Sequence, residues 1–117
     1  ALGWPEQRIK IEWNDIDVAL FDRAYEPEKA QPIGIVETKK LHAGLGYAEA
    51  QAQEYAKRWP TCSKIVVTDG VAYKLLGRDA QSWKLRGVMN IIRRPRREHP
   101  YLQGVGGAEA VFRALLP

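Results

Sequence analysis

The sequence contains a single cysteine, Cys62, which excludes an internal disulfide, and its cysteine and histidine residues do not have the spacing of a zinc site. No apolar run approaches the roughly 18 residues that cross a bilayer, and no charged-then-apolar leader opens the chain. There is no internal repeat and no low-complexity tail. These absences predict a cytoplasmic domain that has no disulfide, no membrane partner and no metal–thiolate centre.

The chain has 117 residues, of which 45% are hydrophobic and 27% are charged, as in an ordinary globular protein. A chain of this length buries roughly two thirds of its unfolded surface, so residues 1–117 are expected to form a single domain with one core. Residues 1–58 carry eight Lys and Arg against ten Asp and Glu, whereas residues 59–117 carry ten against four. The basic second half indicates either a polyanionic partner or only a solvated surface.

Apolar residues alternate with polar ones in several short segments, and this period of two indicates β-strands. The first two segments flank Asn14-Asp15, a turn signal that favours an antiparallel hairpin, and Asp69-Gly70 separates another such pair. The predicted strands cover residues 9–13, 16–20, 33–39, 64–68, 71–76 and, at an edge of the sheet, 83–92.

Two further segments have the composition and the apolar spacing of amphipathic helices. The first, residues 47–58, follows a loop at residues 41–46 and ends before Pro60. The second, residues 108–116, follows a glycine-rich stretch that begins the carboxyl-terminal extension. The order of strands and helices predicts an α+β or α/β sandwich with a mixed sheet.

Three ionisable residues fall at the predicted strand ends: Asp17 on the second strand, and Glu37 with Lys39 on the third. Positions i and i+2 of a strand share a face, so Glu37 and Lys39 can address one site, which Asp17 joins if the two strands are neighbours. Paired carboxylates suit Mg²⁺, which takes oxygen ligands, and Thr38 could add its backbone carbonyl. The Lys39 ammonium would then orient water or stabilise charge on a phosphoryl oxygen.

Two plainer interpretations of these charges remain open. Asp, Glu and Lys at strand ends are often no more than surface ion pairs. Because Glu37 and Lys39 follow the apolar run Ile33 to Val36, we expect them to be at least partly buried, and an unpaired buried charge is costly. A buried ion pair therefore competes with a metal site.

Several short motifs follow one another in an order that is familiar from nucleases. They are Leu2-Gly3-Trp4, Asp17-Val18-Ala19-Leu20, Val36-Glu37-Thr38-Lys39, Gln51-Ala52-Gln53-Glu54-Tyr55-Ala56 and Val67-Thr68-Asp69-Gly70. Together they resemble the PD-(D/E)xK nuclease superfamily and, more narrowly, the amino-terminal endonuclease domain of the restriction (R) subunit of type I restriction-modification enzymes. The resemblance covers residues 2–76; the D…ExK pattern alone is common by chance, and its combination with Gln51-x-x-x-Tyr55 and the Thr68-Asp69-Gly70 turn is more specific.

The resemblance implies a restriction-endonuclease-like fold, in which helices flank a central mixed sheet. It implies that Asp17 and Glu37, with Thr38, are Mg²⁺ ligands and that Asp17, Glu37 and Lys39 are the catalytic residues. ATP would be needed only by a motor domain elsewhere in a longer protein or complex, because this chain lacks a Gly-x-x-x-x-Gly-Lys-Ser/Thr loop.

The same resemblance implies supporting roles for residues outside this triad. Gln51 and Tyr55 would form the helix motif that supports the site and the nearby DNA, and their spacing of four independently puts them on one helix face. A core contact is the alternative for this pair. Glu12, on the first strand, would be an additional acidic residue.

The sequence departs from the family pattern in two places. Ile16 precedes Asp17 where the superfamily name has proline, and the helix that the family has before Leu2 is absent. We expect residues 108–116 to pack in the place of that helix, since their apolar stripe needs burial, although a chain cut from a longer protein would explain the absence equally well.

Four arginines surround Pro95 in a segment that cannot be a central strand, because proline lacks the ladder donor and the cations repel one another. We expect an exposed basic loop that either contacts DNA phosphates or only improves solubility. Its arginines are Arg93, Arg94, Arg96 and Arg97.

The sequence therefore predicts a Mg²⁺-dependent DNA endonuclease domain that acts on double-stranded DNA. As implied by the resemblance, its other partners would be the helicase or translocase and the methylation and specificity subunits of a restriction complex. Two alternatives stay open: a non-catalytic DNA-binding or assembly module of the same fold, and a repair-type nuclease of the same superfamily.

Overall fold

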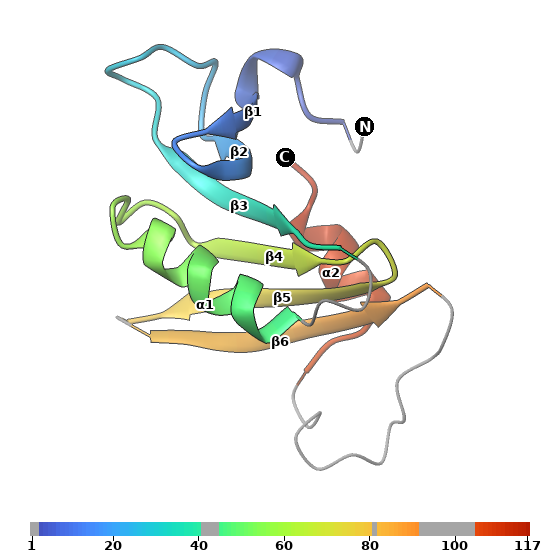
Figure 1. Ribbon diagram of the computed structural model, residues 1–117. Helices are drawn as coiled ribbons and strands as arrows, with labels where there is room; N and C mark the ends of the chain where they lie inside the picture. The colour runs from blue at the N-terminus through green and yellow to red at the C-terminus, as the bar shows by residue number, and fades with distance from the viewer. Residues whose placement is uncertain (1–2, 41–44, 81, 92–104) are drawn as a thin grey trace.

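Across the described residues 3–40, 45–80, 82–91 and 105–117, a computed structural model shows a mixed sheet of six strands with one helix on each face (Figure 1). The strands lie in the order β1-β2-β3-β4-β5-β6; β3 and β4 run parallel, and the other neighbouring pairs are antiparallel. The predicted α+β class with a mixed sheet is confirmed. The elements are η1 (Glu6–Arg8), β1 (Ile9–Trp13), β2 (Ile16–Phe21), β3 (Pro32–Thr38), α1 (Leu45–Ala56), β4 (Lys64–Thr68), β5 (Ala72–Asp79), β6 (Ser82–Asn90) and α2 (Ala108–Ala114).

Both predicted hairpin turns are confirmed. Asn14 and Asp15 have φ values of 48° and 68°, the left-handed pair that a two-residue turn between antiparallel strands requires. In the second turn Gly70 has φ 92°, and Oδ1 of Asp69 accepts hydrogen bonds from the N–H groups of Val71 and Ala72. Local side-chain chemistry therefore fixes the pairing of β1 with β2 and of β4 with β5.

Helix α1 covers one face of the sheet and packs on β3 and β4 (Figure 1). It begins at Leu45, two residues before the predicted start. The predicted loop at residues 41–46 was therefore wrong at residues 45 and 46, because the first turn of the helix includes Gly46. Its buried stripe consists of Leu45 and three fully buried alanines, Ala48, Ala52 and Ala56. Small side chains let the helix axis lie close to the sheet.

The helix ends at Ala56 rather than at residue 58 because Arg78 from β5 closes its last turn. The Arg78 guanidinium donates hydrogen bonds to the carbonyls of Ala56, Trp59 and Cys62, at 3.3, 3.5 and 2.7 Å. Cys62 itself is fully buried, and burial raises the pKa of its thiol to about 11. A buried thiol with a raised pKa is a core residue and not an activated nucleophile.

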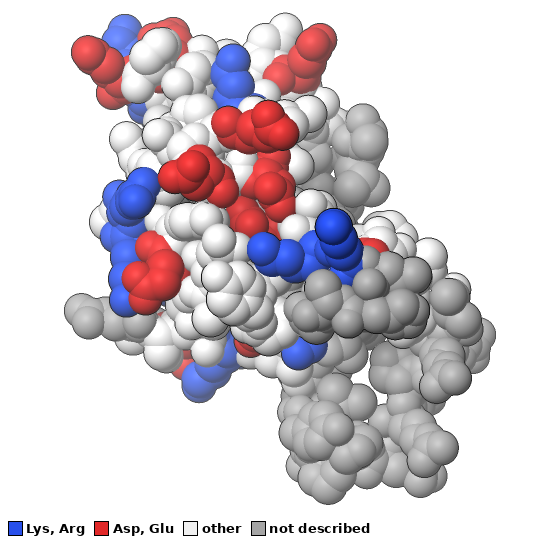
Figure 2. All heavy atoms as spheres, in the orientation of Figure 1, with Lys and Arg blue, Asp and Glu red and all other residues white. Residues whose placement is uncertain are grey.

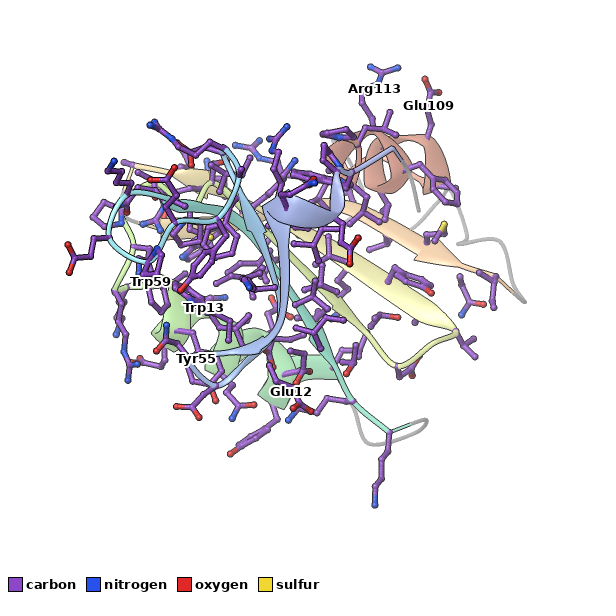
Figure 3. The ribbon with its side chains drawn as sticks, turned by 90° about the horizontal axis from the view of Figure 1, so that it is seen from above. Glu12, Trp13, Tyr55, Trp59, Glu109 and Arg113 are labelled. Carbon is purple, nitrogen blue, oxygen red and sulfur yellow. The ribbon has the colours of Figure 1, made fainter. Side chains whose placement is uncertain are left out.

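The main core lies between α1 and the sheet, and aromatic rings close one end of it. The Trp13 ring packs 5.0 Å from Phe21, 6.3 Å from Tyr25 and 4.8 Å from Trp59, measured between centroids. Figure 3 shows Trp13 and Trp59 side by side. The cluster could not be read from the sequence, because its members come from four separate segments.

Helix α2 packs on the other face of the sheet, against β5 and β6 (Figures 1 and 3). Val111 is fully buried there with Val66, Leu75 and Met89. The helix ends at Ala114, two residues earlier than predicted, and Phe112 stays 47% exposed. The expectation that residues 108–116 need burial is met in part, on the face opposite α1.

The two ends of the described chain are tied to each other beside α2. The Trp4 indole N–H donates a hydrogen bond to the Leu115 carbonyl, and the Lys64 ammonium donates one to the Ala114 carbonyl. Arg8 and Lys64 both lie over the Trp4 ring, 4.8 and 5.6 Å from its centroid. Figure 1 shows the two termini close together.

The remaining predicted bounds differ by a few residues. Strand β3 covers residues 32–38 rather than 33–39, and β2 extends one residue beyond the predicted 16–20. Strand β5 continues to Asp79 instead of residue 76, because β6 pairs with it along its whole length, up to Asp79 opposite Ser82. The predicted edge position of β6 is confirmed, but the strand covers Ser82–Asn90 instead of the predicted residues 83–92, and Ile91 already lies beyond its end.

Candidate active site

Strands β2 and β3 bring Asp17 and Glu37 together. Val18 pairs with Val36 in the antiparallel register, so the next residues along, Asp17 and Glu37, lie beside each other. The Asp17 N–H donates a hydrogen bond to Oε1 of Glu37 at 3.1 Å. The condition on which the sequence joined Asp17 to Glu37, that the second and third strands are neighbours, is met.

Asp17 in turn holds the end of β3. Its Oδ2 accepts hydrogen bonds from the backbone N–H of Thr38 at 2.7 Å and from the Thr38 hydroxyl at 2.9 Å. Each carboxylate therefore binds the backbone of the opposite strand through one oxygen, Oδ2 of Asp17 and Oε1 of Glu37. The second oxygen of each takes part in none of these bonds, and the pair is held in one relative orientation.

Glu37 is buried, with only 3% of its surface exposed. It lies on the same face of β3 as Ile35, which packs in the core under α1. Burial raises the pKa of the Glu37 carboxyl and the Asp17 charge raises it further, while the Asp17 N–H and the Lys39 charge oppose this rise. A carboxyl group whose ionised form is disfavoured by burial is typical of functional sites as well as of buried ion pairs.

Lys39 follows β3 and is held by two residues of α1. Its ammonium donates a hydrogen bond to Oε1 of Gln51 at 3.0 Å and lies over the Tyr47 ring, 5.4 Å from the centroid. Its backbone N–H donates to the Thr68 carbonyl of β4 at 2.9 Å. The Lys39 head group is therefore fixed from the helix, while its backbone is fixed from the sheet.

Gln51 links Lys39 to Tyr55, one helical turn further on. The Gln51 side chain hydrogen-bonds to Tyr55. Burial raises the pKa of the Tyr55 hydroxyl, and the negative charges of Glu37 and Asp15 raise this pKa further. The prediction that Gln51 and Tyr55 share a helix face is confirmed. Gln51 reaches Lys39, whereas Tyr55 also packs against the main core, so a core contact stays open as the role of Tyr55.

Glu12 lies on β1 between two positions that pair with β2, Ile11 opposite Val18 and Trp13 opposite Ile16. Its backbone is therefore beside Asp17, on the same side of the sheet as Tyr55 in Figure 3. Glu12 has φ 53°, a left-handed conformation that is uncommon for a glutamate. The structure thus places the proposed additional acidic residue on the strand next to the Asp17–Glu37 pair, with an exposed side chain.

The face that carries α1 is rich in acidic side chains. Figure 2, seen from that side, shows Asp and Glu gathered beside the helix with Lys and Arg next to them. Within the residues that the structure describes, no group of three or more His, Cys, Asp and Glu is arranged to hold a metal ion. Carboxylate oxygens are the hard donors that Mg²⁺ prefers, so Asp17 and Glu37 are the residues that could hold this ion, with water or phosphate oxygens as its other ligands.

The predicted DNA contacts of the basic loop cannot be compared with the structure. Arg93, Arg94, Arg96 and Arg97 lie outside the described residues.

Thr38 contacts the site through groups that the sequence did not suggest. Its N–H and hydroxyl donate hydrogen bonds to Asp17, whereas the sequence suggested only its carbonyl as a ligand.

Sequence reasoning missed Tyr47. The tyrosine precedes Gln51 by four residues, as Gln51 precedes Tyr55, so the three side chains form one continuous stripe along α1. This spacing was visible in the sequence and could have added Tyr47 to the candidate site.

A scan against protein-family models found no matching family, and searches of curated proteins and of solved structures found no similar protein.

Proposed function

We propose that this chain is a Mg²⁺-dependent DNA endonuclease domain with a restriction-endonuclease-like fold, of the kind found in the restriction subunit of type I restriction-modification enzymes. The observation that supports the proposal is the Asp17–Glu37 pair, with Lys39 two residues after Glu37 and held by α1. Glu37 accepts the Asp17 N–H at 3.1 Å, and Lys39 is held over the same face by Gln51 at 3.0 Å. Two carboxylates beside an ammonium group suit phosphodiester hydrolysis.

In this proposal Asp17 and Glu37 would hold Mg²⁺ through the oxygens that are not bound to the sheet backbone. Mg²⁺ at this place would lower the pKa of a water molecule and offset negative charge on the phosphate. Thr38 keeps the Asp17 carboxylate oriented through its two hydrogen bonds. The ion would also favour the charged form of Glu37, whose burial otherwise raises the pKa of the carboxyl.

Lys39 would face the phosphate of the DNA strand. Hydrolysis forms a bond between phosphorus and the water oxygen and breaks the bond between phosphorus and the leaving deoxyribose oxygen, which takes up a proton. Negative charge builds on the non-bridging oxygens as this happens, and the Lys39 ammonium would stabilise it. Gln51 keeps that ammonium pointed along the face, so it acts as a positioning residue.

Cleavage of supercoiled plasmid with and without Mg²⁺ tests the proposal. We expect Glu37→Gln and Lys39→Met to lose about 100-fold or more of the cleavage rate, since each removes a charge that acts on the transition state. Glu54→Gln is the matched control, because Glu54 pairs with Lys57 on the exposed side of α1. Equal cleavage by the wild type, Glu37→Gln and Lys39→Met would remove these residues from the mechanism.

A second candidate is a non-catalytic DNA-binding or assembly module of the same fold. It is favoured by the fact that Asp17 and Lys39 already have partners in the protein, Thr38 and Gln51, as in a purely structural network. Calorimetric titration with Mn²⁺ separates the two candidates. Heat that disappears in Asp17→Asn supports a metal site, whereas a titration without heat in the wild type supports the module.

A repair-type nuclease of the same superfamily would use the same residues on a different DNA structure. Plasmid, nicked and branched DNA compared side by side would distinguish it from a restriction nuclease.

A further inference from the structure

Tyr47 is an exposed aromatic residue at the edge of the candidate site. It lies in the first turn of α1, and 72% of its surface is exposed, so its ring contributes little to the core. A single exposed ring is common on protein surfaces, so its exposure alone does not indicate a ligand. The position of this ring, next to Lys39, is what indicates one.

One face of the Tyr47 ring is used by the protein itself. The Lys39 ammonium lies over it at 5.4 Å from the centroid, a cation–π contact that holds the ring beside the site. The neighbouring residues of the stripe, Gln51 and Tyr55, are half-buried. The stripe therefore runs from half-buried at Tyr55 to open at Tyr47, and the exposed end is the part that an incoming ligand meets first.

We propose that Tyr47 is a DNA-contacting residue whose exposed ring stacks on a nucleobase next to the phosphate that Lys39 faces. The inference rests on the proposed function, since it assumes a DNA strand at Lys39. A cation beside an aromatic ring is the combination that binds single strands: the ammonium meets the phosphate and the ring meets the base. Stacking requires a base that has left the duplex stack, so the favoured substrate has an unpaired base beside the scissile phosphate.

The test measures DNA binding separately from cleavage, in a buffer with Ca²⁺ in place of Mg²⁺. The probes are a fluorescent single-stranded oligonucleotide, the same sequence as an intact duplex, and a duplex with a one-nucleotide gap. We expect Tyr47→Ala to weaken binding of the single strand and the gapped duplex by about 5- to 100-fold, the usual effect of losing one base stack. Binding of the intact duplex should change much less.

Two further variants exclude a general loss of structure. Tyr47→Trp should bind the single strand as well as the wild type or better, because the larger ring keeps the stacking surface. Phe112→Ala removes an exposed ring from α2, on the opposite face of the sheet, and should leave binding of every probe unchanged.

The outcomes separate this inference from the proposed function. If the wild type cleaves DNA with Mg²⁺ but Tyr47→Ala binds all probes like the wild type, the stacking role is overturned and the nuclease proposal stands. If the wild type cleaves no DNA but binds the single strand more tightly than Tyr47→Ala does, the nuclease proposal fails while the contact at Tyr47 stands. Equal loss for the intact duplex would overturn the preference for an unpaired base.

Discussion

The two faces of the sheet are built differently, although one helix covers each. The α1 face contains the larger core, closed by the aromatic cluster of Trp13, Phe21, Tyr25 and Trp59, and its apolar packing ends in charged groups. The α2 face has a smaller core around Val111 and leaves Phe112 largely exposed. The face with more packing is thus the face that contains the buried carboxylate, Glu37. Rigid packing holds the ionised form of Glu37 in a fixed position although burial disfavours that form, and a preorganised site needs such fixed groups.

Three alanines explain how α1 can both pack on the core and position polar side chains at the candidate site. Ala48, Ala52 and Ala56 are fully buried against β3 and β4, and their small side chains bring the helix close to the strands. Gln51 and Tyr55 project beside this stripe, so close packing is what lets Gln51 reach Lys39 at 3.0 Å. On the α2 face the polar contacts lie at the end of the helix, where the Lys64 ammonium of β4 donates a hydrogen bond to the Ala114 carbonyl.

The largest difference between the faces should appear when one aromatic ring is removed from each. Phe21→Ala deletes a fully buried ring from the aromatic cluster and should cost about 3–5 kcal/mol in the free energy of unfolding. Phe112→Ala deletes a ring that is 47% exposed on α2 and should cost about 0.5 kcal/mol or less. Urea unfolding of both variants measures this contrast. Equal costs would mean that the two cores contribute alike.

A smaller effect is expected from overpacking the alanine stripe. Ala52→Leu should destabilise the fold by about 1–3 kcal/mol and push α1 away from β3, which would also slow DNA cleavage by separating Gln51 from Lys39. Ala50→Leu on the exposed side of the same helix is the matched control, with an expected change of about 0.5 kcal/mol or less. Denaturant unfolding and plasmid cleavage are measured on both. If Ala52→Leu were as stable and active as Ala50→Leu, close packing of α1 would not be needed.

The smallest effect is a change in the pH dependence of stability. The folded-state pKa of Glu37 is raised above 4.5, chiefly by burial, so its contribution is fully present below pH 4.5 and is lost as the pH rises through the folded pKa. The stability of the wild type relative to Glu37→Gln should therefore fall as the pH rises above 4.5, as measured by thermal unfolding over a series of pH values.

Asp79 provides a comparison of opposite sign, away from the site. Its pKa is lowered below 3.8 by the hydrogen bond and charge of Lys84, so its contribution is present above pH 3.8 and is lost as the pH falls through the folded pKa. The stability of the wild type relative to Asp79→Asn should rise with pH in the acid range. A Glu37→Gln profile that ran parallel to the Asp79→Asn profile would show that Glu37 ionises favourably in the fold.

Sequence patterns predicted most of the elements and the main geometry of the site. Alternation found the strands, Asn14-Asp15 and Asp69-Gly70 identified the turns, and the i, i+2 rule put Glu37 and Lys39 on one face. These features depend on neighbours in the chain, which is why sequence alone could reach them.

The features that were missed depend on contacts between distant segments. The end of α1 is set by Arg78, which lies 22 residues after Ala56, and the position of α2 is set by the space left on β5 and β6. Tyr47 was missed for a different reason: its spacing from Gln51 was visible in the sequence, but the contact of its ring with Lys39 joins α1 to the end of β3 and appears only in the structure. The nuclease activity and the family assignment remain predictions.

The joined ends beside α2 have a consequence for protein engineering. Because Trp4 reaches Leu115 and Lys64 reaches Ala114, a linker of a few residues could close the backbone into a ring. New ends could then be opened in the exposed loop at Glu26 to Lys29, between β2 and β3, without interrupting any strand. Such a circular permutant would keep every side chain of the α1 face, and its new ends between β2 and β3 would be free for fusion to a second protein.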